Sequence, residues 1–359
     1  MMKARTAHTR ASRAPAGRSR QSGFGIVELM VGMFLGLLIV GGAIAMYVRS
    51  QETYRTSEGL ARIQENLRTS FEMMAREIRQ AGGTMCGTSL VANRISDDPS
   101  TAAINENAWH NWQAGTLIAY GTETDAPGVD FGTAPGDRVE DTQAIFVLSG
   151  SIGRSVPITA HNVAGAQMTL PDGHGFSADD IVVACDDKGG AIFQISNATS
   201  NSIEHHEAGL NCSQNLGGSL DCASPSARNF YDSGNQSGYL TAVTAALWYI
   251  GHNGRGGHSL YRLTSSGKEE IAEGVAVSAA AGITGLKVDY LTDDGTGLST
   301  EWQELPEDST SIDWSQAATD KVMAVRVTLN LQSIANISID NTPLQRTLVF
   351  VANLRSRTT

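Results

Sequence analysis

An uninterrupted apolar segment near the N-terminus constrains this chain more than any other feature. From Leu29 to Met46, eighteen residues carry no charge. A helix of that length spans roughly 27 Å at 1.5 Å per residue, enough to cross most of a bilayer core. Directly before it stands Glu28, and a carboxylate in such a segment costs on the order of 2.5–3.5 kcal/mol on insertion scales. Glu28 is therefore a candidate functional residue; the alternative is a signal anchor whose glutamate lies among the lipid headgroups.

The charges are distributed unevenly around this segment. The first 23 residues carry +6 and no acid, from Lys3, Arg5, Arg10, Arg13, Arg18 and Arg20. The whole chain carries −11, so the residues after Gly23 carry −17. A basic leader before an apolar run places the N-terminus in the cytoplasm and the body across the membrane. The acidic body argues against nucleic acid as a partner, because phosphate contacts need clustered Lys and Arg.

The helical pattern continues beyond the apolar run in amphipathic form. Apolar residues recur every three or four positions, at Leu60, Ile63, Leu67, Phe71, Met74 and Ile78. Gly82 and Gly83 follow, and glycine readily leaves helical geometry. The sequence therefore predicts one helix from Phe24 to Ala81, apolar nearly all round in its first half. Its second half has a single apolar stripe, which we expect to pack on a globular body.

After Cys86 the pattern changes to short strands and polar loops. Val325, Val327, Leu329 and Leu331 alternate with polar residues, as in a half-buried antiparallel strand. The predicted strands are Ala144–Leu148, Ile181–Cys185, Ala191–Ile195, Ala246–Ile250, Leu260–Leu263, Gly285–Leu291, Val322–Leu331 and Thr347–Leu354. Residues 96–140 and 197–237 lack periodicity and are predicted to be long loops. The predicted fold is α+β, with one long N-terminal helix laid across an antiparallel sheet.

Four cysteines follow the membrane segment: Cys86, Cys185, Cys212 and Cys222. An even number in an exported body indicates disulfides, with three possible connectivities. Cys212 and Cys222 bracket a short polar loop and are predicted to pair, which leaves Cys86 with Cys185. A metal site does not fit, because there is no C-x-x-C and no histidine at ligand spacing from two cysteines.

Other chemical motifs in the sequence are weak. Ser265-x-x-Lys268 has the spacing of an acyl-transfer nucleophile, but it lies between two predicted strands and is expected to be a turn. His205 and His206 are expected to be solvated loop residues rather than metal ligands. Asp293–Gly295 is expected to be a turn, because it lacks the ligand number of a calcium loop. The sequence offers no convergent acid, base and nucleophile, so we expect neither enzymatic activity nor a cofactor.

The start of the chain resembles a type IV prepilin signal: a basic leader ending in Gly23, then Phe24, then Glu28, then the apolar run to Met46. Most of the chain after Gly23 is similar to the PilW family of minor pilins, more loosely over residues 88–140. The segments that carry this similarity are REIRQAGGTMCG, GFSADDIVVACDDKGGAIFQIS, LWYIGHNGRGGHSLYRL, GITGLKVDYLTDDG, DWSQAATDKVMAVRVTLNLQS and VFVANLRSR. The leader is longer than that of a type IVa pilin.

The resemblance implies how the N-terminus is used. A prepilin peptidase would cut between Gly23 and Phe24 on the cytoplasmic side and methylate the new Phe24 amine. The apolar helices would then bundle into a filament core, where Glu28 would pair with the Phe24 amine of a neighbouring subunit. The implied parts are a leader (1–23), a membrane and filament-core helix (24–47), its amphipathic continuation (48–82) and a globular body (83–359).

The function implied by the resemblance is that of a minor pilin that helps initiate or cap a type IV pilus, with roles in twitching motility and adhesion. Its partners would be the prepilin peptidase, the major pilin, other minor pilins and a large tip adhesin. The protein would start in the inner membrane with a periplasmic body and then reach the pilus or cell surface. A J-type minor pseudopilin of a type II secretion system is an alternative. A membrane-tethered binding protein or enzyme is another.

Overall fold

The computed structural model describes residues 23, 25–86, 90–96, 109–231, 238–278, 282–308, 312, 314–315, 318, 321–336 and 342–354. The chain divides into two compact units, Met1–Arg55 and Thr56–Thr359. Helix α1 (Ile26–Gln80) belongs to both units. Its bounds agree with the predicted helix to within two residues at each end, and Phe24 itself lies outside the described residues.

The first unit consists, in its described part, of the apolar half of α1. The large apolar side chains from Ile26 to Tyr54 are all exposed there, with Ile26 at 80% and Leu37 at 71%. Within the described residues, α1 alone is long and apolar enough to cross a membrane. A helix pairs its backbone polar groups within the segment itself, which is what an apolar, membrane-spanning segment requires.

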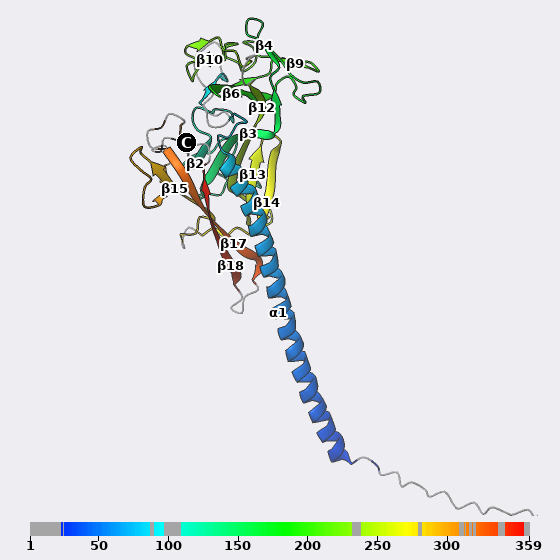
Figure 1. The fold of residues 1–359 in the computed structure, drawn as a ribbon. Coiled ribbons are helices and arrows are strands. Elements are labelled where there is room, and N and C mark those ends of the chain that lie inside the picture. The colour runs from blue at the N-terminus through cyan, green and yellow to red at the C-terminus, as the bar shows by residue number, and fades with distance from the viewer. Residues whose placement is uncertain are drawn as a thin grey trace, which may run out of the picture. The chain divides into compact units, whose positions relative to one another are not determined.

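The second unit begins with the amphipathic half of α1, which packs on strands (Figure 1). Its buried stripe is Ile63, Leu67, Ser70, Met74, Ala75 and Ile78, the apolar members of which follow the predicted period. Phe71 contacts Phe350 edge-to-face, with ring centroids 5.1 Å apart. The helix ends at Gln80; two residues later, Gly82 has a left-handed φ of 69°, and its N–H donates to Leu148 O at 2.9 Å.

The largest sheet has eight strands, all antiparallel except for the β1–β7 pair. Its centre is β12 (Tyr239–His252), a long strand with a bulge between Thr241 and Val243. One path through the sheet is β1 (Val91–Asn93), β7 (Gly189–Gln194), β6 (Ile181–Asp186), β12, β13 (His258–Thr264) and β14 (Gly267–Glu273). β3 (Ala144–Pro157) also pairs with β12, and β2 (Leu117–Tyr120) pairs with β3.

A second, C-terminal sheet is fully antiparallel. Its strand order is β16 (Gln303–Glu304), β15 (Leu286–Asp293), β17 (Lys321–Asn336) and β18 (Pro343–Asn353). Val325, Val327, Leu329 and Leu331 of β17 are buried, as their alternation predicts. They join the stripe of α1 and buried residues of β12, β13 and β15 in one apolar core. The α+β class, with a long N-terminal helix and a mostly antiparallel body, is confirmed.

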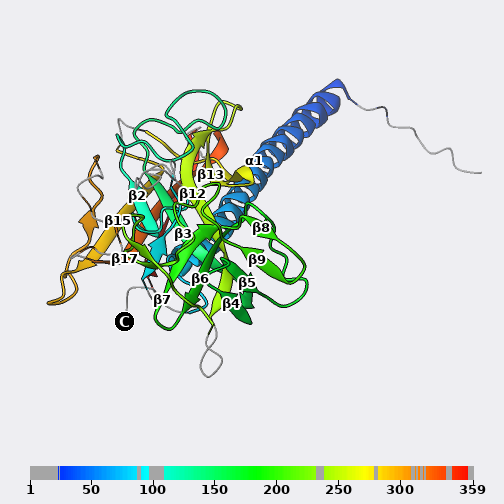
Figure 2. The ribbon, with the colours of Figure 1, turned by 90° about the horizontal axis from the view of Figure 1, so that it is seen from above.

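Two small sheets contradict the prediction that residues 197–237 are loops. One is β4 (Ala160–Asn162), β5 (Gln167–Thr169), β9 (Ser202–Glu204) and β8 (Asn197–Ala198), beside β6 in Figure 2. The other pairs β10 (Gly217–Gly218) with β11 (Pro225–Ser226). β2 likewise lies within the predicted loop 96–140. Strands of two to four residues are too short to show a period-two pattern, so tertiary pairing alone defines them.

Candidate functional site

The N-terminal signal lies at the beginning of α1. Leu29 N–H donates to Gly25 O at 3.1 Å and closes the first helical turn. Glu28 is the acidic residue of that turn, near backbone N–H groups that have no helical acceptor. A Cβ added at Gly23 or Gly25 would meet no atom within 4 Å, so the chain itself does not require glycine there. Phe24 lies outside the described residues.

The surface behind Glu28 is apolar and uncovered. Phe34 is 64% exposed, and an added Cβ at Gly32, Gly36 or Gly41 would meet nothing within 4 Å. Burying one such large apolar side chain fully is worth about 1.5–3 kcal/mol. The apolar side chains of the first half of α1 therefore have no packing partner among the described residues. Lipid or other chains can cover them.

A polar contact fixes the second half of α1 against the large sheet. Glu77 accepts a hydrogen bond from Trp248 Nε1 at 2.7 Å and from Arg262 Nε at 2.9 Å. Arg262 Nη2 also lies 2.7 Å from the same carboxylate. Trp248 is fully buried, and the ion pair is about four-fifths buried. Because β12 and β13 both contribute partners, this contact sets the rotation of the helix about its axis.

A disulfide closes the end of the helix onto the same sheet. Cys86, six residues after the end of α1, is bonded to Cys185 at the end of β6, with a Cα–Cα distance of 5.8 Å. The two cysteines are 99 residues apart. The pairing is the predicted one, and it links α1 covalently to the β6–β7 hairpin.

The second disulfide, Cys212–Cys222, is also the predicted pair, and it closes a loop around a buried arginine. Arg94 has no exposed surface and donates to backbone carbonyls of the loop, Asn215, Gly217, Ser219 and Asp221, at 2.5–2.9 Å. Burial lowers the pKa of Arg94, and the nearby Asp221 opposes that shift. Sequence reasoning missed this role, although an arginine within the apolar stretch VANRI is an available signal.

Arg138 organises a second loop region in the same way. Its guanidinium donates to Thr124 O and Gly121 O, both at 2.8 Å, and also to Thr142 O. It lies 4.4 Å from the centroid of the Phe131 ring. Burial lowers the pKa of Arg138 to about 10, against the raising effect of Asp125. The predicted loop 96–140 is therefore ordered, in its described part, around one cation.

His205 is not a solvated loop residue, which corrects the sequence-based expectation. It is 1% exposed because the pairing of β5 with β9 draws it beneath β4. His161 Nδ1 accepts from Phe230 N–H at 3.2 Å, so its Nε2–H donates to His205 Nε2 at 3.0 Å. Burial lowers the pKa of His161 to about 4 and that of His205 to about 3. In the described part of the chain, no three His, Cys, Asp or Glu side chains form a metal-binding cluster.

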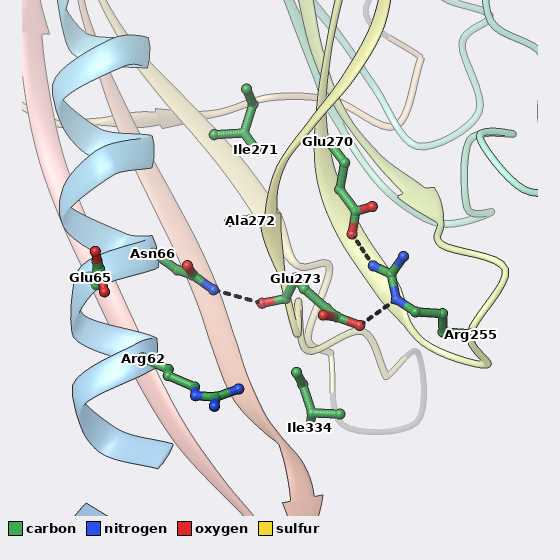
Figure 3. A pocket seen from close by; sticks show the side chains of 9 residues that line it. All are labelled: Arg62, Glu65, Asn66, Arg255, Glu270, Ile271, Ala272, Glu273 and Ile334. Carbon is green, nitrogen blue, oxygen red and sulfur yellow. Dashed lines mark hydrogen bonds and ion pairs between the residues drawn. The ribbon is translucent and has the colours of Figure 1, made fainter. Parts of the chain in front are cut away.

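A groove of about 520 Å³ runs between α1 and β14 (Figure 3). Asn66 Nδ2 donates to Glu273 O at 3.4 Å across it, and Arg255 binds both Glu270 and Glu273. The remaining lining residues are Arg62, Glu65, Ile271, Ala272 and Ile334. On the β14 side of the groove, Arg255 thus forms ion pairs with both carboxylates, those of Glu270 and Glu273.

The Ser265-x-x-Lys268 and Asp293–Gly295 motifs lie at turns, as expected. Ser265 lies in the tight turn between β13 and β14, and Lys268 Nζ donates to Gly136 O at 3.0 Å rather than facing it. In the other turn, Asp293 Oδ1 accepts from Gly295 N–H at 2.8 Å, so this carboxylate oxygen is used by its own backbone.

Comparison with known proteins decides the nature of the N-terminus. A family model described as a prokaryotic N-terminal methylation motif matches residues 18–44. This is a prepilin-type signal. The match covers the leader end, Gly23, Glu28 and most of the apolar run, so the chain carries the type of signal that a prepilin peptidase processes in type IV pilin-like and pseudopilin proteins, within a helix long and apolar enough to cross a membrane. No curated protein and no solved structure matches the chain.

Proposed function

We propose that this chain is a minor pilin that helps to initiate or cap a type IV pilus. The observation that carries the proposal is an uncovered apolar helix behind a prepilin signal, with one carboxylate in its first turn. A helix that served only as an anchor would gain stability in lipid without that charge. Glu28 therefore needs a partner that a simple anchor does not provide.

The first step is removal of the leader. A prepilin peptidase hydrolyses the Gly23–Phe24 amide at the cytoplasmic face, and the new Phe24 amine is methylated. The chain leaves open space around Gly23, so the need for glycine arises in the enzyme, which must approach the backbone closely. The basic leader holds this end of the chain in the cytoplasm.

Glu28 acts in the second step, when the helix leaves the membrane sideways into a bundle of other helices. A carboxylate buried there without a partner is strongly unfavourable, and breaking a buried ion pair costs about 3–5 kcal/mol. The methylated ammonium of Phe24 on a neighbouring subunit is the available cation. Pairing of the two groups fixes the axial position of one subunit against the next.

We favour a minor over a major subunit because the sequence of the body resembles the PilW family. The similar segments form the hairpin of β6 and β7, the hairpin of β12 and β13, and the strands β15, β17 and β18. On this proposal its partners are the major pilin, other minor pilins and a large tip adhesin, in twitching motility and adhesion. A J-type pseudopilin of a type II secretion system would share the same signal and layout.

The proposal is tested by mass spectrometry of sheared pili. We expect an N-terminal peptide that begins at methylated Phe24, at low abundance relative to the major subunit. Gly23→Val should leave the full precursor in the inner membrane, whereas Gly25→Ala, which meets equally open space, should be processed. An intact leader in the wild type would refute the pilin assignment. Processed protein that is absent from pili, together with loss of type II secretion on gene deletion, would favour the pseudopilin.

A further inference from the structure

The edge strand β18 differs from the other edges of the two large sheets. β18 is eleven residues long, pairs with β17 alone, and keeps nine consecutive register pairs from Ala324↔Asn353 to Gln332↔Gln345. β1, β2 and β16 are edges of only two to four residues. β14 is longer but carries Lys268, Glu269, Glu270 and Glu273. Short length and charge are the usual protections of an edge; β18 is long, and Arg346 is its one charged residue.

The outer face of β18 is apolar at its centre. Val349 is 53% exposed and Val351 is 44% exposed, while Phe350 and Ala352 on the other face are buried in the core. Gln345, Thr347 and Asn353 complete the exposed row. Water can hydrogen-bond the unpaired backbone groups along this edge, but a protein segment pairs with the whole row in register only as another extended strand.

The positive charges on β17 and β18 favour a binding segment that carries acidic residues. β17 and β18 contain Lys321, Arg326 and Arg346 and no acid, in a chain of net charge −11. Arg326 is paired with Asp289 at 2.6 Å, whereas the exposed Arg346 has no ion-pair partner among the described residues. A complementary strand would therefore place a carboxylate near Arg346 and β-branched side chains beside Val349 and Val351.

A second copy of this chain does not supply such a strand from its described edges. A second β18 brings no carboxylate and adds a second Arg346. The β14 edge is acidic but presents no exposed large apolar side chain. We infer that β18 is a docking edge that takes up an extended, acid-bearing segment of a different protein as an added β-strand.

The test is photo-crosslinking of the full chain in its native host. A photo-reactive residue replaces Thr347 on β18, and a control chain carries it at Glu269 on β14. We expect Thr347 to crosslink to a different protein, within a segment that contains Asp or Glu among β-branched residues. Adding Val349→Lys should lower the yield by about tenfold or more, because charge on an edge opposes strand addition. Leu298→Lys is the matched control, since Leu298 is also 53% exposed but lies outside β18.

The possible outcomes separate this inference from the proposed function. Crosslinks from Thr347 only to a second copy of the chain, or none at all in a processed and disulfide-bonded protein, would overturn the docking edge. A yield that Val349→Lys does not change would overturn it as well. Leader cleavage is measured in the same cells by N-terminal mass spectrometry. A cleaved protein without the expected crosslink would refute the docking edge and leave the minor-pilin proposal standing. An uncut leader would refute the minor-pilin proposal alone.

Discussion

The two halves of α1 share one secondary structure and differ in what surrounds them. From Ile26 to Tyr54 the large apolar side chains are exposed all round the helix. From Ile63 to Ile78 only one stripe is apolar, and it is buried against strands. Helix propensity is therefore not what separates them; the arrangement of apolar residues around the axis assigns the second half to the body and the first half to lipid or other chains.

The largest expected effect concerns the covalent link at the helix end. Removing Cys86–Cys185 by Cys→Ser exchange should lower the free energy of unfolding by about 5 kcal/mol, and removing Cys212–Cys222 by about 3 kcal/mol, because the longer loop gains more chain entropy. Urea unfolding of the full chain in detergent, followed by tryptophan fluorescence, measures both. A larger loss from the Cys212–Cys222 variant would show that the 99-residue link does not hold the helix to the sheet.

Matched truncations test the two halves directly. Ile78 is fully buried and Leu37 is 71% exposed. Ile78→Ala should cost about 2–5 kcal/mol of unfolding free energy, through lost burial and a cavity. Leu37→Ala should change the unfolding of the body by less than about 0.5 kcal/mol, as is usual for exposed sites. Equal effects in the same urea titration would contradict the division of the helix into two surroundings.

Acid should destabilise the body through its buried histidines. The folded-state pKa values of His161 and His205 are about 4 and 3, below the ordinary value of about 6.5. The unfolded chain therefore binds protons first, so this stability is complete above pH 6.5 and is lost as the pH falls toward 4. Each group contributes a slope of up to about 1.4 kcal/mol per pH unit.

The readout for this effect is the unfolding free energy between pH 7 and pH 4.5, compared between variants. His161→Gln with His205→Gln should flatten the slope, although at a lower starting stability. His206→Gln, at a ring that is 47% exposed, is the control and should keep the wild-type slope. A slope that the double variant leaves unchanged would assign the acid sensitivity to other groups, among them His110, whose pKa burial also lowers to about 4.

The parts of this molecule that could be predicted from sequence are those with a local pattern. The helix bounds, the alternating strand β17 and the cysteine pairs all follow from spacing along the chain. β9 and β10 could not be predicted, because two or three residues carry no period. The prepilin signal is likewise local, and the family model finds it.

The contacts that sequence reasoning missed depend on tertiary structure. The sequence pattern places Glu77 on the polar face of an amphipathic helix and so predicts a solvent-facing acid. In the structure it binds Trp248 and Arg262, more than 170 residues away. Arg94 stands out in the sequence only as an arginine among apolar neighbours, and its acceptors are carbonyls of a loop about 120 residues further along the chain. Backbone acceptors have no sequence signature, so the sequence can single out such an arginine but cannot show what it binds.

The central claim is that the first half of α1 serves assembly, and Glu28→Leu tests it most directly. The variant removes a charge from an apolar segment, which should improve a simple anchor. In a minor pilin it removes the partner of a neighbouring Phe24 amine. Glu28→Asp, which keeps the charge, and Glu52→Leu, on the exposed helix beyond the apolar run, are the controls.

The measurement is surface piliation and twitching motility in a strain that lacks the native gene, with protein levels matched by immunoblot. Glu28→Leu should be cleaved and folded, because neither Gly23 nor the sheets are altered, and should fail to restore pili. Glu52→Leu should restore them, and Glu28→Asp should restore them at least in part. Normal piliation by Glu28→Leu at equal abundance would contradict the pairing of Glu28 with a neighbouring subunit and return the helix to the role of a tether.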